Sequence, residues 1–81
     1  MISCDQHDYI EIACMFRYPI ILTLKSGEVI EGTALDTALN EHKDECIKVA
    51  VNGSEPLVVL TELSLLEVAV DNPHFKRVSF A

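Results

Sequence analysis

The sequence is poor in basic residues. Six lysines and arginines stand against thirteen aspartates and glutamates, which gives a formal net charge of −7 at pH 7. Nucleic-acid binding needs basic side chains that neutralise the phosphate backbone, so this charge disfavours direct binding of nucleic acid. It favours basic partners instead, including proteins that themselves bind nucleic acid.

Paired cysteines, long apolar runs and a secretory signal are also missing. The three cysteines are an odd number without a C-x-x-C pair, so no disulfide framework is expected. No apolar stretch approaches the roughly 20 residues that a membrane helix needs. The N-terminus has no basic region and carries an acid by Asp5. We therefore expect a cytoplasmic protein with reduced thiols and no membrane partner.

Recognisable catalytic motifs are absent as well. The sequence contains no G-x-S-x-G, Walker or H-E-x-x-H string. Its 81 residues predict a single domain over residues 1–81, with a modest core and little room for a deep cleft. We expect a protein that is not an enzyme and that has no cofactor.

Near the N-terminus, the sequence predicts a helix over about residues 5–16. At 100° per residue, four side chains share one face at the i, i+3, i+4, i+7 spacing of a buried stripe. They are Tyr9, Ile12, Ala13 and Phe16. We expect this face to pack against the rest of the protein. Pro19 helps to end the helix, because the residue before a proline avoids helical backbone angles.

Three carboxylates precede the first basic residue of the chain, and all three belong to this segment: Asp5, Asp8 and Glu11. Asp5 lies where an N-cap is expected, and its side chain can accept from free N–H groups of the first turn. Asp8 and Glu11 fall together on a flank beside the apolar stripe. They either start a solvated helix or present acid to a partner, and the helix geometry alone does not decide between these readings.

The remainder, about residues 19–80, alternates between β-rich stretches and turn signals. Strands are expected at 20–25, 28–36, 46–51, 56–60, 65–70 and, at the end of the chain, 75–80. Residues 37–45 read as a loop, Asn52-Gly53 as a hairpin turn, and Gly32 as a bend, a bulge or a close backbone approach.

This layout predicts a mainly β fold with one N-terminal helix. A small Sm-like or SH3-like barrel of about five to six antiparallel strands fits it best. A two-layer α+β sheet is the alternative, because local pattern does not show whether the edges of the sheet close.

Two other functions stay open from the residues alone. Cys4-x-x-His7 and His42-x-x-x-Cys46 could form two halves of a tetrahedral zinc site in a structural adaptor, since thiolate and imidazole are the usual ligands. The second is an RNA-binding Sm-like module. Its basic residues would be scattered and its aromatics few, which argues against it.

The string Cys4-Asp5-x-x-Asp8-Tyr9-Ile10-Glu11-Ile12-Ala13-Cys14 resembles the start of the Rof family, also called YaeO, of Rho-binding antiterminators. Leu22-Thr23-Leu24, Gly27-Glu28, Ala34 and Asp36 continue the likeness. It covers most of the chain, is strongest over residues 4–36 and is loose after Glu41.

The resemblance implies an Sm-like barrel with an N-terminal helix that binds the hexameric termination factor Rho. It also implies inhibition of Rho-dependent termination, because the acidic protein would cover the basic primary RNA-binding surface of Rho and compete with RNA. We expect a monomer that does not itself bind nucleic acid, with no catalytic or metal-binding residues. The expected Rho-binding residues are Asp5, Asp8, Tyr9, Glu11 and Asp36.

Overall fold

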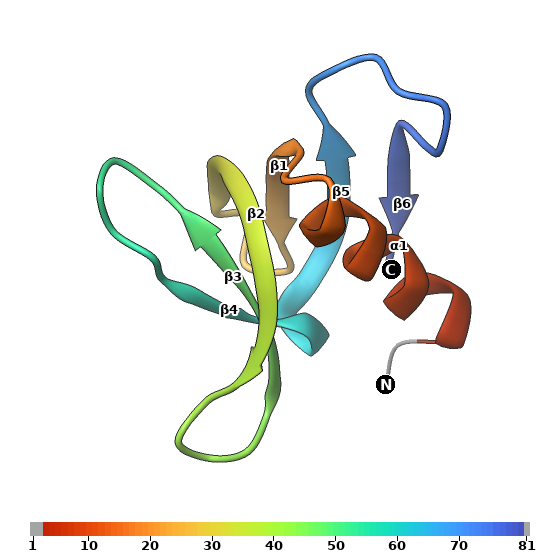
Figure 1. Ribbon diagram of the computed structural model, residues 1–81. Helices are drawn as coiled ribbons and strands as arrows, with labels where there is room; N and C mark the ends of the chain where they lie inside the picture. Colours follow the sequence, from red (N-terminus) through yellow and green to blue (C-terminus); the bar gives the residue numbers. More distant parts are fainter. Residues whose placement is uncertain (1–2, 81) are drawn as a thin grey trace.

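A computed structural model describes residues 3–80, which form one α-helix, six strands and one turn of 3-10 helix (Figure 1). The elements, in chain order, are α1 (Cys4–Met15), β1 (Pro19–Leu24), β2 (Val29–Leu39), β3 (Glu45–Ala50), β4 (Leu57–Val59), η1 (Leu60–Glu62), β5 (Leu63–Val68) and β6 (Arg77–Ser79). The predicted mainly β fold with one N-terminal helix is confirmed.

All six strands belong to one antiparallel sheet in the order β4-β3-β2-β1-β5-β6. β4 and β6 are therefore the edges of the sheet, and η1 connects β4 to β5 across it. Within residues 3–80 no backbone pairing joins the two edges, so closure into a barrel stays a prediction.

The polar stretch 37–45 was predicted to be a loop, and this is wrong at both ends. β2 continues to Leu39 and β3 begins at Glu45, with these two residues paired. Only a short turn remains, and the Asn40 side chain organises it by accepting hydrogen bonds from the backbone N–H groups of His42 and Asp44, each at 2.9 Å. Because Asn40 satisfies the turn so locally, the ladder can extend almost to it.

The core is aliphatic and is shared by the helix and the sheet. The buried side chains of its main cluster come from α1, from β1 to β5 and from η1: Ile10, Ala13, Cys14, Ile20, Leu22, Ala34, Ile47, Val49, Val58, Leu60, Leu63 and Leu66. Cys46 of β3 and Val78 of β6 are also buried. α1 packs against β2. Near its start the Gln6 amide Nε2 donates to the Ser79 carbonyl of β6 at 3.0 Å. Figure 1 shows the helix on the β6 side of the sheet. The helix thus spans from the central strand β2 to the edge strand β6.

The N-cap of α1 is Ser3, and the prediction of Asp5 at this position is wrong. The Ser3 hydroxyl accepts from the Gln6 N–H at 3.1 Å, and the Gln6 side chain accepts from the Ser3 N–H at 2.8 Å. This reciprocal pair is a capping box, which satisfies two otherwise free donors of the first turn. Asp5 therefore lies within the helix, in its first turn.

The predicted buried stripe of α1 is also wrong. The buried residues are Ile10, Ala13 and Cys14, whereas Tyr9 and Phe16 are exposed. Only Ala13 belongs to both sets. The helix is therefore turned about its axis relative to the prediction.

Gly32 allows β2 to pass close to β3, which is one of the three alternatives that its position within a strand predicted. A Cβ atom at Gly32 would overlap the Ala50 carbonyl oxygen, and it would lie 2.7 Å from a methyl group of Val49 and 2.9 Å from one of Val51. Since one of these neighbours is backbone, the crowding cannot be relieved by rotating a side chain.

We expect Gly32→Ala to lower the free energy of unfolding by about 1–3 kcal/mol, the usual cost of overpacking. Urea unfolding followed by circular dichroism would measure it. The neighbouring exposed residue provides a control, because Glu31→Ala should change stability by no more than about 0.5 kcal/mol. Equal stability of the two variants would contradict the close approach.

Candidate functional site

The side of α1 that points away from the sheet carries acidic residues. Because Ile10 and Cys14 face the core, the opposite side of the helix is formed by Asp5, Asp8 and Met15, all of them exposed. We call this side the outer face of α1. It places two of the predicted site residues, Asp5 and Asp8, directly in solvent.

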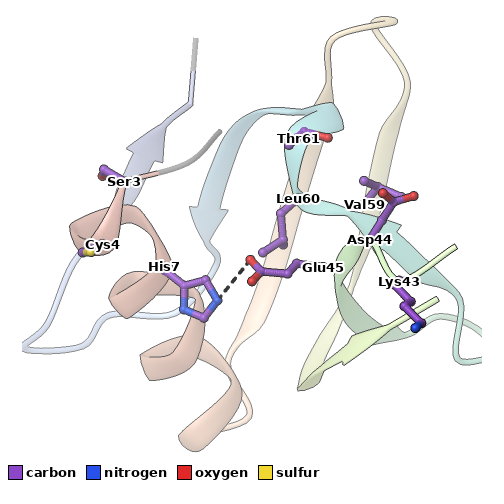
Figure 2. A pocket seen from close by; sticks show the side chains of 9 residues that line it. All are labelled: Ser3, Cys4, His7, Lys43, Asp44, Glu45, Val59, Leu60 and Thr61. Atoms are coloured by element: carbon purple, nitrogen blue, oxygen red, sulfur yellow. Dashed lines mark ion pairs between the residues drawn. The ribbon is translucent and has the colours of Figure 1, made fainter.

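Glu11 lies on the flank of α1 that faces β3. Its Oε1 is 3.5 Å from Nδ1 of His7. The other ring nitrogen of His7 is 3.6 Å from Oε2 of Glu45 (Figure 2). His7 therefore stands between two carboxylates and forms ion pairs with both when it is protonated. This arrangement links the flank of the helix to the start of β3.

A β-bulge brings Asp36 to the same region. The register between β2 and β3 shifts between Ala34 and Asp36, so that Leu35 is an extra residue in β2. Ala34 is buried and Asp36 is exposed. In a regular strand, residues that are two positions apart face the same side of the sheet, so the bulge is what separates these two side chains. The Oδ1 atom of Asp36 accepts a hydrogen bond from the backbone N–H of Thr37 at 2.8 Å, which restrains the Asp36 side chain.

Glu11 and Asp36 line one shallow hollow of about 380 Å³ between α1 and β2. Its remaining lining residues are Cys14, Met15, Arg17, Leu35 and Thr37. The structure thus brings together two predicted site residues that are far apart in the sequence. Arg17, with a positive φ of 52° just after the helix, reaches the same hollow.

Tyr9 lies on the opposite flank of the outer face. Its ring is 4.9 Å from that of Phe75, in the segment before β6. Phe16 also lies outside the core, where its ring stacks on Tyr18 at 5.5 Å and on His74 at 4.9 Å. Sequence reasoning missed this surface group because nothing local in the sequence pairs residues 74 and 75 with the helix.

The acids of the outer face are not neutralised by basic side chains of the same molecule. Within residues 3–80 each ion pair joins a histidine to a glutamate, and none joins a carboxylate to a lysine or an arginine. Asp5 and Asp8 take part in no ion pair in this part of the chain. The negative charge on α1 is thus available to an external cation.

The proposed zinc ligands do not meet. Cys4 and His7 line a hollow of about 600 Å³ with residues 43–45 and 59–61 (Figure 2). Cys46 is buried and its thiol donates to the Asp44 carbonyl at 3.4 Å, while His42 lies beside Glu41. Among the described residues, no three histidine, cysteine or acidic side chains are arranged to hold a metal ion.

The two buried thiols are poor nucleophiles. Burial raises the pKa of Cys14 from 9.0 to about 11; the carboxylate of Asp36 adds to the shift, Arg17 opposes it and Glu11 adds to it. Burial also raises the pKa of Cys46, with help from Asp44. A thiol must ionise to attack or to bind metal, so both cysteines act as apolar packing groups at neutral pH.

Comparisons with known proteins agree with one another. The sequence profile described as "Modulator of Rho-dependent transcription termination (ROF)" matches residues 1–80. A solved structure, "YaeO bound to Magnesium from Vibrio cholerae O395", is 43% identical in sequence and superposes with a TM-score of 0.88. The match covers 91% of this chain and 96% of that one. No curated protein matches significantly.

The described helix is too short to cross a membrane.

The raised pKa of Cys14 makes stability fall at alkaline pH. In the folded protein the thiol keeps its proton up to about pH 11, whereas an unfolded chain releases it near pH 9. The contribution of the protonated Cys14 thiol to the free energy of unfolding is therefore complete below about pH 9 and is lost as the pH rises towards 11. Urea unfolding would measure the free energy of unfolding at about pH 8 and at about pH 10.5. Between these two pH values it should decrease less for Cys14→Ala than for the exposed control Cys4→Ala. Equal decreases would contradict this linkage.

Proposed function

This chain belongs to the Rof family of modulators of Rho-dependent transcription termination, and from this premise we propose that it inhibits termination by binding Rho through the outer face of α1. Glu11 and Asp36, beside that face, extend the proposed binding surface, and Tyr9 borders it on the other flank. The protein acts as a monomer, in the cytoplasm where Rho acts, and without catalysis.

The observation that carries this proposal is the set of carboxylates on α1 without basic partners. Folding orients Asp5 and Asp8 into solvent, and the bulge in β2 places Asp36 beside Glu11. With a net charge of −7, the protein as a whole attracts a basic surface. A factor that loads onto RNA presents such a surface.

Competition with RNA is the proposed mechanism. Carboxylates can take the places of RNA phosphates on lysine and arginine side chains, because charge-assisted hydrogen bonds to either anion have similar geometry. The acidic protein would then cover the primary RNA-binding surface of Rho and keep the transcript from loading. Its own charge repels the transcript, so no direct contact with nucleic acid is part of the mechanism.

Magnesium, which the Vibrio cholerae structure contains, is not part of the proposal. Within residues 3–80 the chain shows no group of three possible ligands arranged around one point. The acidic side chains of α1 are assigned to a protein partner because the net charge of −7 favours a basic surface.

Reversing two charges of the site tests the proposed surface. We expect Asp8→Lys with Glu11→Lys to weaken binding to Rho by at least about tenfold, because two attractive contacts become repulsive. Isothermal titration calorimetry with the Rho hexamer would measure the Kd. Both residues are exposed, so the double variant should fold, which circular dichroism would verify.

The matched control is Glu28→Lys with Glu55→Lys. These residues are also exposed, lie away from α1 and change the net charge by the same amount. Binding should decrease much less than for the α1 variant. If both double variants lose the same amount of affinity for Rho, the binding surface is assigned to the wrong place and only net charge matters. If neither loses affinity, the assigned surface is wrong as well.

A competition experiment tests the mechanism separately. Saturating Rho with a pyrimidine-rich RNA should suppress binding of the protein in the calorimeter, because both ligands would need the same basic side chains. Binding that the RNA leaves unchanged would retain Rho as the partner and reject competition. Binding of that RNA to the protein itself would instead favour an RNA-binding module.

A further inference from the structure

Aromatic side chains gather at one place on the surface instead of filling the core. Four of the five phenylalanines and tyrosines of the chain, together with one histidine, form what we call the aromatic cluster. Its members are Tyr9, Phe16, Tyr18, His74 and Phe75. The core beneath contains aliphatic side chains, with alanines and a cysteine, so the position of these rings needs another explanation.

Some rings of the aromatic cluster are partly buried against the core, and others are exposed to solvent. Tyr18 and Phe75 are partly buried and pack against the core. Phe16 keeps 49% of its surface exposed and Tyr9 keeps 37%, while the neighbouring Met15 is 72% exposed. Rings that are anchored below and open above lose little side-chain freedom on binding, which is why aromatic residues and methionine are enriched in the centres of protein interfaces.

The open rings are continuous with the acids of the outer face of α1. Tyr9 follows Asp5 by one helical turn and is next to Asp8 in the chain, and Phe16 lies two turns further along. A cation that stacks on a ring and also reaches a carboxylate satisfies both kinds of group. A planar guanidinium does so better than an ammonium, because it stacks face to face and offers several N–H donors.

We propose that the aromatic cluster is a docking surface for arginine side chains of the basic protein that the acids of α1 engage. One guanidinium stacks on the exposed ring of Tyr9, and its N–H groups donate to the carboxylates of the outer face, which lie within one helical turn. A second stacks on the exposed ring of Phe16, about 10 Å further along the helix. This inference rests on the proposed function for the identity of the partner, Rho. It adds arginine recognition by rings to attraction by charge.

Removing an exposed ring tests the cluster with Rho itself. Phe16→Ser should weaken binding by about tenfold, the effect of losing an interface hot spot. The affinity should keep its salt dependence, since no charge is removed, whereas reversing Asp8 and Glu11 should flatten it. Val29→Ser is the control, because Val29 is 56% exposed on β2 and lies outside the cluster. A loss no larger than in the control would overturn the inference.

A second measurement does not depend on Rho and keeps failure of this inference distinct from failure of the proposed function. The protein would be titrated with hexa-arginine and with hexa-lysine, which carry equal charge, and the ring protons of Tyr9, Phe16 and His74 would be followed by NMR. We expect tighter binding of hexa-arginine and shifts of these ring signals. Equal affinities without ring shifts would overturn arginine recognition, even in a protein that binds Rho. Ring shifts caused by single-stranded RNA instead would reassign the cluster to nucleobases.

Discussion

The contact of Ile10, Ala13 and Cys14 with the sheet determines how the rest of the molecule faces its surroundings. Two of these side chains are small, so the helix backbone can lie close to β2, and Gln6 joins the first turn to β6. Once this side of α1 is buried, the opposite side must be solvent-exposed. The orientation of the acids is therefore a consequence of packing, and a change in the core beneath α1 would move the proposed binding surface without altering any of its residues.

The chain keeps its negative charge unpaired. Six basic residues are too few to neutralise thirteen acids, and within residues 3–80 the ion pairs involve histidines alone. Surface ion pairs contribute little to stability, about 0–1 kcal/mol each, so their absence costs the fold little. An external basic surface then meets carboxylates that need not first release an internal partner. His7 lies between Glu11 and Glu45, so Glu11 is the one acid of the proposed site on α1 with a histidine beside it.

Local pattern predicted the helix, about five to six strands, a special backbone feature at Gly32 and the exposure of Asp8 and Glu11. It failed where distant residues decide the outcome. Residues 37–39 begin a stretch that is polar as a whole, yet they extend β2 because β3 supplies a pairing partner. A bulge brings Asp36 to the hollow that Glu11 also lines, and the sequence has no local sign of this bulge. The partners of Tyr9 and Phe16 lie near the other end of the chain, so no periodicity could reveal the aromatic cluster.

The two errors in the helix have one cause. With Asp5 as the N-cap, its side chain would lie outside the helix, and the stripe of Tyr9, Ile12, Ala13 and Phe16 could be buried freely. With Ser3 as the N-cap, Asp5 is a helical residue one turn before Tyr9 on that same stripe. Burying the stripe would then bury an unpaired carboxylate, which costs far more than exposing two rings. The helix turns its aliphatic side inward instead. The burial of Ile10, Ala13 and Cys14 thus sets the rotation of α1, and this rotation places rings and acids on one surface.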